Sequence, residues 1–537
     1  MNSELYNERL KTARSLGLES TLITKWKSGN CRFYTEISLN KFTLTAANCL
    51  TTMKFSFHSI LFMILLAWSC APGEQGDVDL DDELFQKDLD SIKTHGKLRA
   101  LTTYSATSYF LYRGEPMGFE YELLKRFTEY LGLELELVVT DNIDSMFHQL
   151  NTGDVDIVAH GFAITGERKE NVEFTDYLYL VNQVLVQRKP DNWRKISWSK
   201  LESQLIHDPI QLIGDTISVR QNSSYFKRLE NLSDEIGGKI IIDTLPGHLS
   251  TDEIIKMVAN GKIKYTVADN NIAAINASYY PQLDINVPIS FSQRIAWAVR
   301  PGSDSLLYAA NKWIEQMKKK QDYYVIYNKY FKNKTNYSRR VKSDFYSLNK
   351  NAISAYDDLI KRYAEKIDWD WRLLASLVYQ ESKFEPIAQS WAMASGLMQI
   401  MPSTADELGI NDIENPEENI RGGTEYLQQI GKNFEHIPDS LDRLKFTMAA
   451  FNCGIGHVFD AQRLASKRGL DSLVWDNNVE DMILALSYSA NYNDPVVYYG
   501  YVRGIETYTY VQQIIERYGH YQQFIKREND FVAQAAE

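Results

Sequence analysis

The chain has 537 residues, of which 58 are Lys or Arg and 70 are Asp or Glu, so its formal net charge is −12. Apart from Lys318–Lys320 it has no dense basic block, which argues against a nucleic-acid-binding protein, because such a protein needs cations to neutralise phosphates. A hydrophobic content of 44% is typical of folded protein, and the length exceeds what one hydrophobic core supports. We therefore expect a folded chain of several domains.

The N-terminal region contains a short apolar segment. From Met53 the sequence reads MKFSFHSILFMILLAWSC, with a short basic start and an apolar run too short to span a bilayer. This pattern is typical of a secretory signal, which we predict at 53–70. Residues 1–52 would then be an upstream extension from a misassigned start codon. A genuine cytosolic extension before a buried segment is the alternative.

Cys70 follows the apolar run directly, with Ala67-Trp68-Ser69 before it. It resembles the lipidated cysteine of bacterial lipoproteins, although Trp68 is larger than the usual residue. The resemblance implies a lipid anchor in an envelope membrane, with the mature chain on the periplasmic face as an outer-membrane lipoprotein. An acidic linker, 71–90, would follow. Only Cys453 would then remain as a thiol, and we interpret it as a packing residue.

From about residue 91 to 334, short strand patterns alternate with helical ones. Alternation of this kind favours an α/β architecture with largely parallel sheets. The predicted helix is Tyr121–Leu131, and the predicted strands are Lys97–Thr103, Leu133–Thr140, Asp154–Ala159, Ile240–Ile242 and Tyr265–Ala268.

Three motifs within this region occur together and in order. They are GFEYELLKRFTEYLGL from Gly118, LNTGDVDIVAHGFAITGERKENVEFTDYL from Leu150 and TVADNNIA from Thr266. Together they resemble the family 3 periplasmic solute-binding proteins. The resemblance implies one lobe formed by 91–187 and 288–334 and a second lobe formed by 188–287, with a ligand in the cleft between them.

The same resemblance implies ligand-binding residues. Thr165 and Arg168 match the family's Thr-x-x-Arg element, which holds a ligand carboxylate; a guanidinium can offer it two parallel donors. Asp269 corresponds to the acid that holds a ligand amine, and Ser223 could add a hydroxyl donor. The expected ligand is a small carboxylate, either an amino acid or a cell-wall peptide. Alternatively, Arg168 forms surface ion pairs with Glu170 or Glu173, and Asp269 and Ser223 cap helices.

After a polar linker, 335–350, the pattern is helical over 351–525, and 526–537 forms a tail. The segment Pro402-Ser403-Thr404 indicates a helix start, so we expect Asp406 and Glu407 in the first turn of a helix that stops at Gly409. The predicted helices are Ala355–Ile367, Trp371–Ser382, Ala405–Leu408, Asn419–Asn433, Arg443–Phe451 and Tyr501–Tyr518.

Leu374, Leu377, Val378 and Glu381 fall at positions i, i+3, i+4 and i+7 of a predicted helix. Glu381 therefore lies on the same apolar stripe as the three aliphatic residues. Burial raises a carboxyl pKa, so this acid could stay protonated near neutral pH and donate a proton. A hydrolase of the usual type needs a second carboxylate, and Glu385, directly before Pro386, lies at or beyond the helix end. No convincing partner acid is visible.

The segment ESKFEPIAQSWAMASGLMQIMPSTADELG around Glu381, with MAAFNCGIG from Met448 and IETYTYV from Ile505, resembles the lysozyme-like domain of the soluble lytic transglycosylases. The expected fold is thus a two-lobed α/β binding-protein fold followed by an all-α lysozyme-like domain. This combination resembles the membrane-bound lytic transglycosylase F family. It implies cleavage of peptidoglycan between N-acetylmuramic acid and N-acetylglucosamine, leaving 1,6-anhydro ends, with a ligand-sensing binding domain.

Carried over to this chain, the family pattern implies that Ser390, Gln399, Asn452 and Tyr510 surround the sugar or the acid. Met393 stands where the family commonly has Gly, so we expect strain or a changed loop there. No metal or nucleotide motif is visible, and we expect no cofactor. Two alternatives stay open, namely a hydrolytic muramidase and a catalytically inactive cell-wall receptor; each residue could also be purely structural.

Overall fold

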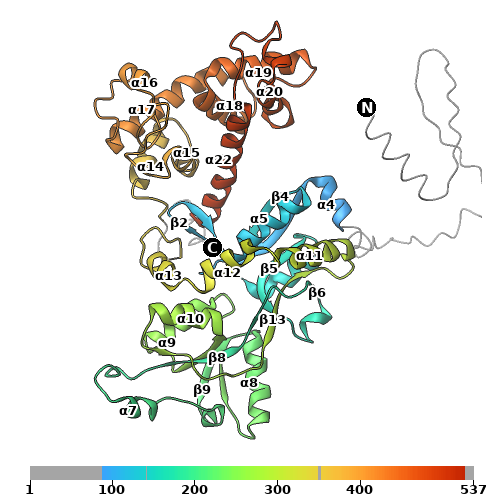
Figure 1. Cartoon of the computed structure of the whole chain (residues 1–537), viewed down its shortest axis with the longest axis vertical. Coiled ribbons are helices and arrows are strands. Elements are labelled where there is room, and N and C mark those ends of the chain that lie inside the picture. The colour runs from blue at the N-terminus through green and yellow to red at the C-terminus, as the bar shows by residue number, and fades with distance from the viewer. Residues whose placement is uncertain (1–87, 141, 349–351, 526–537) are drawn as a thin grey trace, which may run out of the picture. The chain divides into compact units, whose positions relative to one another are not determined.

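The structure is a computed structural model that describes residues 88–140, 142–348 and 352–525 (Figure 1). The predictions for the upstream extension, the signal segment, Cys70, most of the acidic linker and the C-terminal tail fall outside these residues. Within the described residues, no helix is both long and apolar enough to cross a membrane.

The first α/β region is built on a mixed sheet of six strands. Its strands are β1 (Lys97–Thr102), β4 (Glu134–Val139), β5 (Ile157–Ala163), β6 (Glu173–Phe174), β7 (Tyr179–Val181) and β13 (Gln293–Val299). The order is β4-β1-β5-β13-β6; β1 pairs in parallel with β4 and β5, and the returning strand β13 is antiparallel to β5. Leu98 and Ala100 of β1 are fully buried, as the apolar run predicts.

Helices and a small hairpin complete this region. They are α4 (Leu89–His95), α5 (Phe119–Leu131), α6 (Met146–Asn151), α11 (Asp304–Met317) and α12 (Gln321–Phe331), with the hairpin of β2 (Phe110–Tyr112) and β3 (Glu115–Met117). Stacked rings of Trp297 and Trp313, with centroids 5.7 Å apart, join β13 to α11 in the core. The predicted helix over Tyr121–Leu131 is confirmed and starts two residues earlier.

The second α/β region has β8 (Gln183–Arg188) between two antiparallel neighbours, β11 (Tyr265–Asp269) and β12 (Leu283–Asp284). A parallel pair, β9 (Thr216–Arg220) and β10 (Ile241–Leu245), lies beside β11. The helices here are α7 (Trp198–Glu202), α8 (Ser224–Glu235), α9 (Thr251–Ala259) and α10 (Asn270–Tyr279). Because strands β9 and β11 each run into the helix that follows, their ends bring polar residues together.

The polar stretch after this region contains a helix, α13 (Lys334–Val341), that packs on α10. The Tyr337 hydroxyl donates to Asn276 Oδ1 at 2.9 Å. The Arg340 guanidinium lies over the rings of Phe110 and Tyr330, at 5.2 and 5.5 Å from their centroids. Part of the predicted linker is therefore ordered against the α/β region, because its aromatic and arginine side chains find buried partners.

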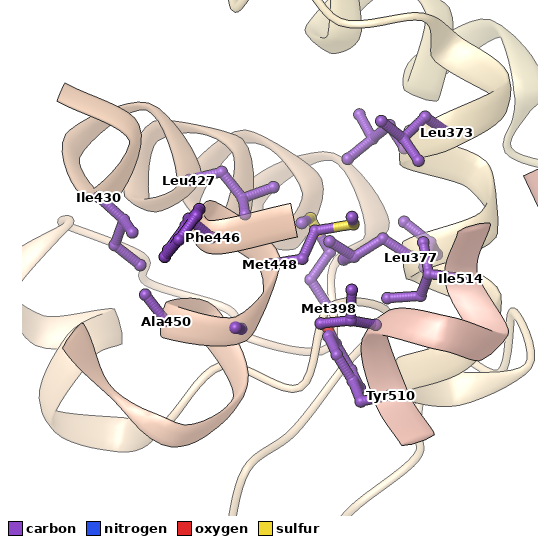
Figure 2. Close-up of a cluster of buried hydrophobic side chains, with 14 of the residues drawn as sticks. Leu373, Leu377, Met398, Leu427, Ile430, Phe446, Met448, Ala450, Tyr510 and Ile514 are labelled. Atoms are coloured by element: carbon purple, nitrogen blue, oxygen red, sulfur yellow. The ribbon is translucent and has the colours of Figure 1, made fainter. Parts of the chain in front are cut away.

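The last region is entirely helical. It contains α14 (Asp357–Lys366), α15 (Trp371–Ser382), α16 (Pro402–Glu407), α17 (Pro416–Gly431), α18 (Ser440–Cys453), α19 (Ile455–Lys467), α20 (Glu480–Ala485), α21 (Ser489–Tyr492) and α22 (Gly504–Phe524). One continuous apolar core joins them, and Figure 2 shows part of it, with Leu377 of α15 beside Ile514 of α22. The Ser376 hydroxyl also donates to the Ile514 carbonyl at 2.8 Å. The predicted bounds of α15, Trp371–Ser382, are confirmed.

Helix α22 contacts two parts of the chain. It packs against α15 along much of its length, and its C-terminal half also contacts the first α/β region. There His520 Nδ1 lies 2.5 Å from the Tyr109 hydroxyl, and the Tyr521 hydroxyl donates to the Gly114 carbonyl at 2.7 Å. Lys125 forms an ion pair with Glu516 at 3.1 Å. One rigid element thus belongs to both the helical core and the α/β surface.

Replacing either of two glycines in α22 by alanine should change the stability in opposite directions. A Cβ on Gly504 would lie 2.0 Å from the Ile483 carbonyl oxygen, whereas a Cβ on Gly519 would have nothing within 4 Å. We expect Gly504→Ala to lower the free energy of unfolding by about 1–3 kcal/mol or more, because the helix start must shift. Gly519→Ala should raise it by about 0.5–1 kcal/mol through helix propensity. Urea denaturation of both variants measures the difference; an unaffected Gly504→Ala protein would contradict this packing.

Candidate active site and solute cavity

Glu381 lies near the C-terminal end of α15, on the face that the helix buries. Leu374, Leu377 and Val378 on that face have no exposed surface, and Glu381 is half-buried beside them. The prediction that this acid shares the apolar stripe is confirmed. Partial exposure leaves the carboxyl group reachable by a substrate, which a purely structural acid would not need.

The pKa of Glu381 is raised to about 7 by burial, and the Tyr510 hydrogen bond opposes this shift. The Tyr510 hydroxyl donates to Glu381 Oε1 at 2.5 Å. No neighbouring carboxylate in the described residues contributes to the shift. Near neutral pH the group can therefore be found in both its acidic and its basic form, as a residue that both gives and takes a proton requires.

The other acids near this part of the sequence are exposed. Glu385 lies beyond the end of α15, as predicted. The prediction that Asp406 and Glu407 lie in the first turn of a helix is wrong, since α16 begins at Pro402 and both acids fall in its last turn. Proline is well suited to the first helical position because it has no N–H to leave unpaired, so the helix starts earlier than the capping pattern indicates.

Helix α22 contacts both the acid and Asn452. Tyr510 contacts Glu381, and Thr507, one turn earlier, donates from Oγ1 to Asn452 Oδ1 at 2.8 Å. Asn452 is exposed at the end of α18. Figure 2 shows Tyr510 at the edge of the core cluster, close to Met398. Glu381, Tyr510 and Asn452 are thus connected through a single helix.

Ser390 shapes the loop that follows α15. Its hydroxyl accepts a hydrogen bond from the Ala394 N–H at 3.0 Å, and its own N–H donates to the Ala394 carbonyl at 2.9 Å. Met393, inside this turn, has a φ of 67° and is mainly exposed. The expected strain at Met393 is therefore present, because only glycine adopts this conformation without cost.

Gln399 braces the same loop. Its Nε2 donates to the carbonyls of Ala388 and Gly396, both at 2.9 Å. Both donors are therefore occupied, and Oε1 is the atom that remains to accept a hydrogen bond. The Ser382 hydroxyl donates to the Leu397 carbonyl at 2.8 Å, which ties this loop to the residue next to Glu381.

Asn419 is a structural residue of this site that sequence reasoning missed. It is fully buried in α17, where Oδ1 accepts from the Met398 N–H at 2.7 Å and Nδ2 donates to the carbonyls of Ser395 and Ile413. A Cβ on Gly396 would collide with its amide. The sequence places Asn419 at the start of a predicted helix, and nothing in the sequence indicates that its amide would be buried.

The four predicted ligand-binding residues of the α/β region line two adjoining cavities. Arg168, Ser223 and Asp269 line an inner cavity, and Thr165 lines an outer one that also includes Arg168 and Ser223. The inner cavity takes residues from both α/β regions. Their side chains therefore face a common space, although they come from sequence positions about a hundred residues apart.

Arg168 makes no ion pair with a carboxylate among the described residues, so the predicted alternative of a surface pair with Glu170 or Glu173 is not found. Its guanidinium donates to the Ala163 carbonyl at 3.0 Å and lies over the Phe162 ring, 4.6 Å from the centroid. Burial lowers the Arg168 pKa to about 10. The group remains charged at neutral pH, and within the described residues Asp269 attracts it only through space, without an ion pair.

Asp269 and Ser223 occupy N-cap positions, of α10 and α8, yet neither side chain makes a capping hydrogen bond. The Ser223 hydroxyl donates instead to the Arg220 carbonyl at 2.7 Å. Burial raises the Asp269 pKa to about 7, and a hydrogen bond from Tyr225 opposes this shift. The simple capping interpretation of these two residues is therefore not found.

Family models match both parts of the chain. Bacterial extracellular solute-binding proteins, family 3, match residues 86–333, and the transglycosylase SLT domain matches residues 358–473. Together with the fold and the half-buried acid, these matches define the class: this is a lytic transglycosylase with an α/β solute-binding domain followed by a helical catalytic domain.

Curated relatives match almost the whole length. The chain is 35% identical over 428 residues to a membrane-bound lytic murein transglycosylase F of Desulfosudis oleivorans, with 80% of this chain and 90% of the relative covered. It is 32% identical over 475 residues to the protein of the same name in Yersinia pestis, with 87% and 91% covered. The chain belongs to the membrane-bound lytic murein transglycosylase F family.

Solved structures match the α/β part. A crystal structure of an ancestral amino acid-binding protein, a precursor of cyclohexadienyl dehydratase, is 26% identical and covers 45% of this chain and 99% of its own, with a TM-score of 0.38. An ancestral arginine-binding protein bound to arginine is also 26% identical, covers 44% of this chain and 98% of its own, and has a TM-score of 0.37.

The raised pKa of Glu381 predicts a pH-dependent stability difference. The folded state holds the proton up to about pH 7 but the unfolded state only to about pH 4.5, so unfolding releases a proton between these values. Stability should therefore fall as the pH rises through this window. Glu381→Gln removes the effect, so its stability relative to the parent should rise by about 2–3 kcal/mol from about pH 4 to about pH 8.

Urea denaturation across this pH range measures the difference. Glu385→Gln is the matched control, because it removes an exposed acid four residues away and should follow the parent protein. Parallel stability curves for the parent and Glu381→Gln would contradict the buried, protonated state of Glu381.

Proposed function

We propose that this lytic transglycosylase cleaves the β-1,4 bond between N-acetylmuramic acid and N-acetylglucosamine without water and leaves 1,6-anhydro ends. The observation that carries the proposal is Glu381, which is half-buried, has a pKa raised to about 7 and lacks a neighbouring carboxylate in the described residues. A single acid that titrates near neutral pH can act first as a general acid and then as a general base.

The reaction proceeds in two proton transfers. Protonated Glu381 gives its proton to the glycosidic oxygen as the bond from C1 of the muramic acid sugar breaks, and the acetylglucosamine leaves as an alcohol. The C6 hydroxyl of the same muramic acid then bonds to C1, and the Glu381 carboxylate takes its proton. The acid is regenerated, one C–O bond replaces another, and no water is consumed.

Tyr510 stabilises the carboxylate form in this scheme, because its hydroxyl already donates to Oε1. Gln399 Oε1 is suited to accept from an N-acetyl N–H, since both Nε2 hydrogens are used within the loop. Asn452 is exposed, and its Oδ1 accepts a hydrogen bond from Thr507. Its Nδ2 hydrogens are therefore suited to donate to a sugar oxygen. Ser390 holds the loop that carries Met393 by accepting from the Ala394 N–H, and its hydroxyl hydrogen is left to donate to a sugar oxygen.

The α/β domain senses a small ligand that carries a carboxylate, an amino acid or a cell-wall peptide, in the cavity with Arg168 and Asp269. Among the described residues Arg168 makes no ion pair, which supports this, since a buried guanidinium normally has a carboxylate partner. Thr165 and Ser223 add hydroxyl groups beside it. Relatives named membrane-bound support a location in the cell envelope, where the lipid at Cys70 would anchor the chain to the outer membrane on its periplasmic side.

Helix α22 offers a physical route from the ligand cavity to catalysis. Tyr510, in its first half, contacts the catalytic acid, and Glu516 and His520, in its second half, contact Lys125 and Tyr109 of the α/β domain. A movement of the α/β surface that displaced this helix would change the hydrogen bond to Glu381. Coupling between the two sites therefore needs no additional element.

The mechanism predicts the mass of the products. Peptidoglycan sacculi digested by the protein should release muropeptides lighter by one water than their hydrolysed counterparts, as measured by mass spectrometry. Glu381→Gln should reduce product release by about 10²–10⁴-fold or more, because it removes the acid and the base together. Reducing ends in place of anhydro ends would favour a muramidase, and no products from either protein would favour a cell-wall receptor.

Ligand sensing predicts that cleavage depends on the cavity. With peptides cut from peptidoglycan by an amidase as the probe, the rate of sacculus cleavage by the parent protein should change, and Arg168→Gln should not respond because the carboxylate site is lost. Arg188→Gln is the matched control, since Arg188 pairs with Asp191 at an exposed position. Equal rates with and without the probe in the parent protein would rule out the coupling.

A further inference from the structure

Arg220 is a second cationic residue in the inner cavity of the α/β domain. It is the last residue of β9 and lines this cavity together with Arg168, Ser223 and Asp269. Only 9% of its surface is exposed. Its Nε atom has no hydrogen-bond partner, and its guanidinium makes no hydrogen bond or ion pair with any residue of the part of the chain that the structure describes. The chain thus buries a cation that nothing within these residues neutralises.

The positive charges in this cavity wall repel each other. Burial lowers the pKa of Arg220, and the positive charge of Arg220 contributes to the lowered pKa of Arg168. The pKa of His160, whose Nδ1 also has no partner, falls to about 3 through burial and repulsion from both arginines. Two guanidinium groups and a neutral imidazole therefore line one space, and each has unsatisfied hydrogen-bonding capacity.

The carboxylates in the cavity wall are already engaged. Glu120 accepts a hydrogen bond from Trp297 Nε1 at 2.5 Å. Asp252 accepts from Asn276 Nδ2 at 2.6 Å, and Asp269 accepts from Tyr225. Asp144 attracts Arg220 through space but is exposed and forms no ion pair with it. The counter-ion for Arg220 must therefore come from outside these residues.

We propose that Arg220 is a second anion-binding residue of this cavity, and that the ligand is an amino acid or short peptide with two acidic groups. One carboxylate binds Arg168, the ammonium faces Asp269, and the second carboxylate binds Arg220. A guanidinium pairs with a carboxylate through two parallel N–H donors, so it distinguishes an acid from the isosteric amide. This inference rests on the proposed sensing function of the same cavity and specifies its ligand class.

The outer cavity has room for a ligand larger than a single amino acid. It has a volume of about 630 Å³ and shares Arg168 and Ser223 with the inner one. A ligand whose acidic end occupies the inner cavity can therefore extend outward by a further residue. The probes should accordingly include both free amino acids and dipeptides.

Calorimetric titration of the full chain tests the assignment with two matched pairs of probes: L-glutamate against L-glutamine, and L-alanyl-L-glutamate against L-alanyl-L-glutamine. At least one acid should bind about tenfold or more tightly than its amide, because a charge-assisted pair is replaced by a neutral contact. In Arg220→Gln this preference should disappear. In Arg188→Gln, the exposed control, it should persist.

Three outcomes overturn the assignment. They are equal affinities within both pairs in the parent protein, an acid preference that survives in folded Arg220→Gln, and no binding of any of the four probes. Thermal denaturation verifies that each variant is folded. Failure of the proposed reaction gives a different result, since the product masses from parent protein and Glu381→Gln do not depend on the titrations.

Discussion

The hydrogen bond between Tyr510 and Glu381 joins the two helices on which the catalytic domain depends. Helix α15 brings an acid into an apolar face, and α22 brings the only hydrogen-bonding group that contributes to the pKa of this acid in the described residues. Neither helix could place its residue alone, because the acid needs desolvation from the core and the hydroxyl needs a fixed position. Packing of Leu377 against Ile514 and the Ser376 hydrogen bond supply that position.

The same helix extends beyond the catalytic core. A buried contact of Tyr109 with His520 and an exposed ion pair of Lys125 with Glu516 hold its C-terminal half against the α/β domain. A long helix transmits displacement well because its backbone hydrogen bonds resist bending. Helix α22 therefore contacts both the catalytic acid, through Tyr510, and the α/β domain, through Glu516 and His520, which gives the proposed regulation a specific location.

Both sites use desolvation as their main physical effect. Burial raises the pKa of Glu381 and of Asp269 to about 7 and lowers that of Arg168 to about 10. In the catalytic domain this makes one acid able to exchange a proton near neutral pH. In the α/β domain, Arg168 and Arg220 are buried without an ion pair among the described residues, and the proposed anionic ligand would offset the free-energy cost of burying them.

The sequence alone determined what short-range patterns encode. The i, i+3, i+4, i+7 spacing predicted α15 and placed Glu381 on its buried face, and the alternating segments predicted the α/β domain, because period and apolarity are local properties. Only the tertiary structure decided the rest. The ordered helix α13, the bracing role of Asn419 and the burial of Arg220 depend on residues far away in the chain. Burial and hydrogen bonding across such distances are properties of the packed core, and no local pattern carries them.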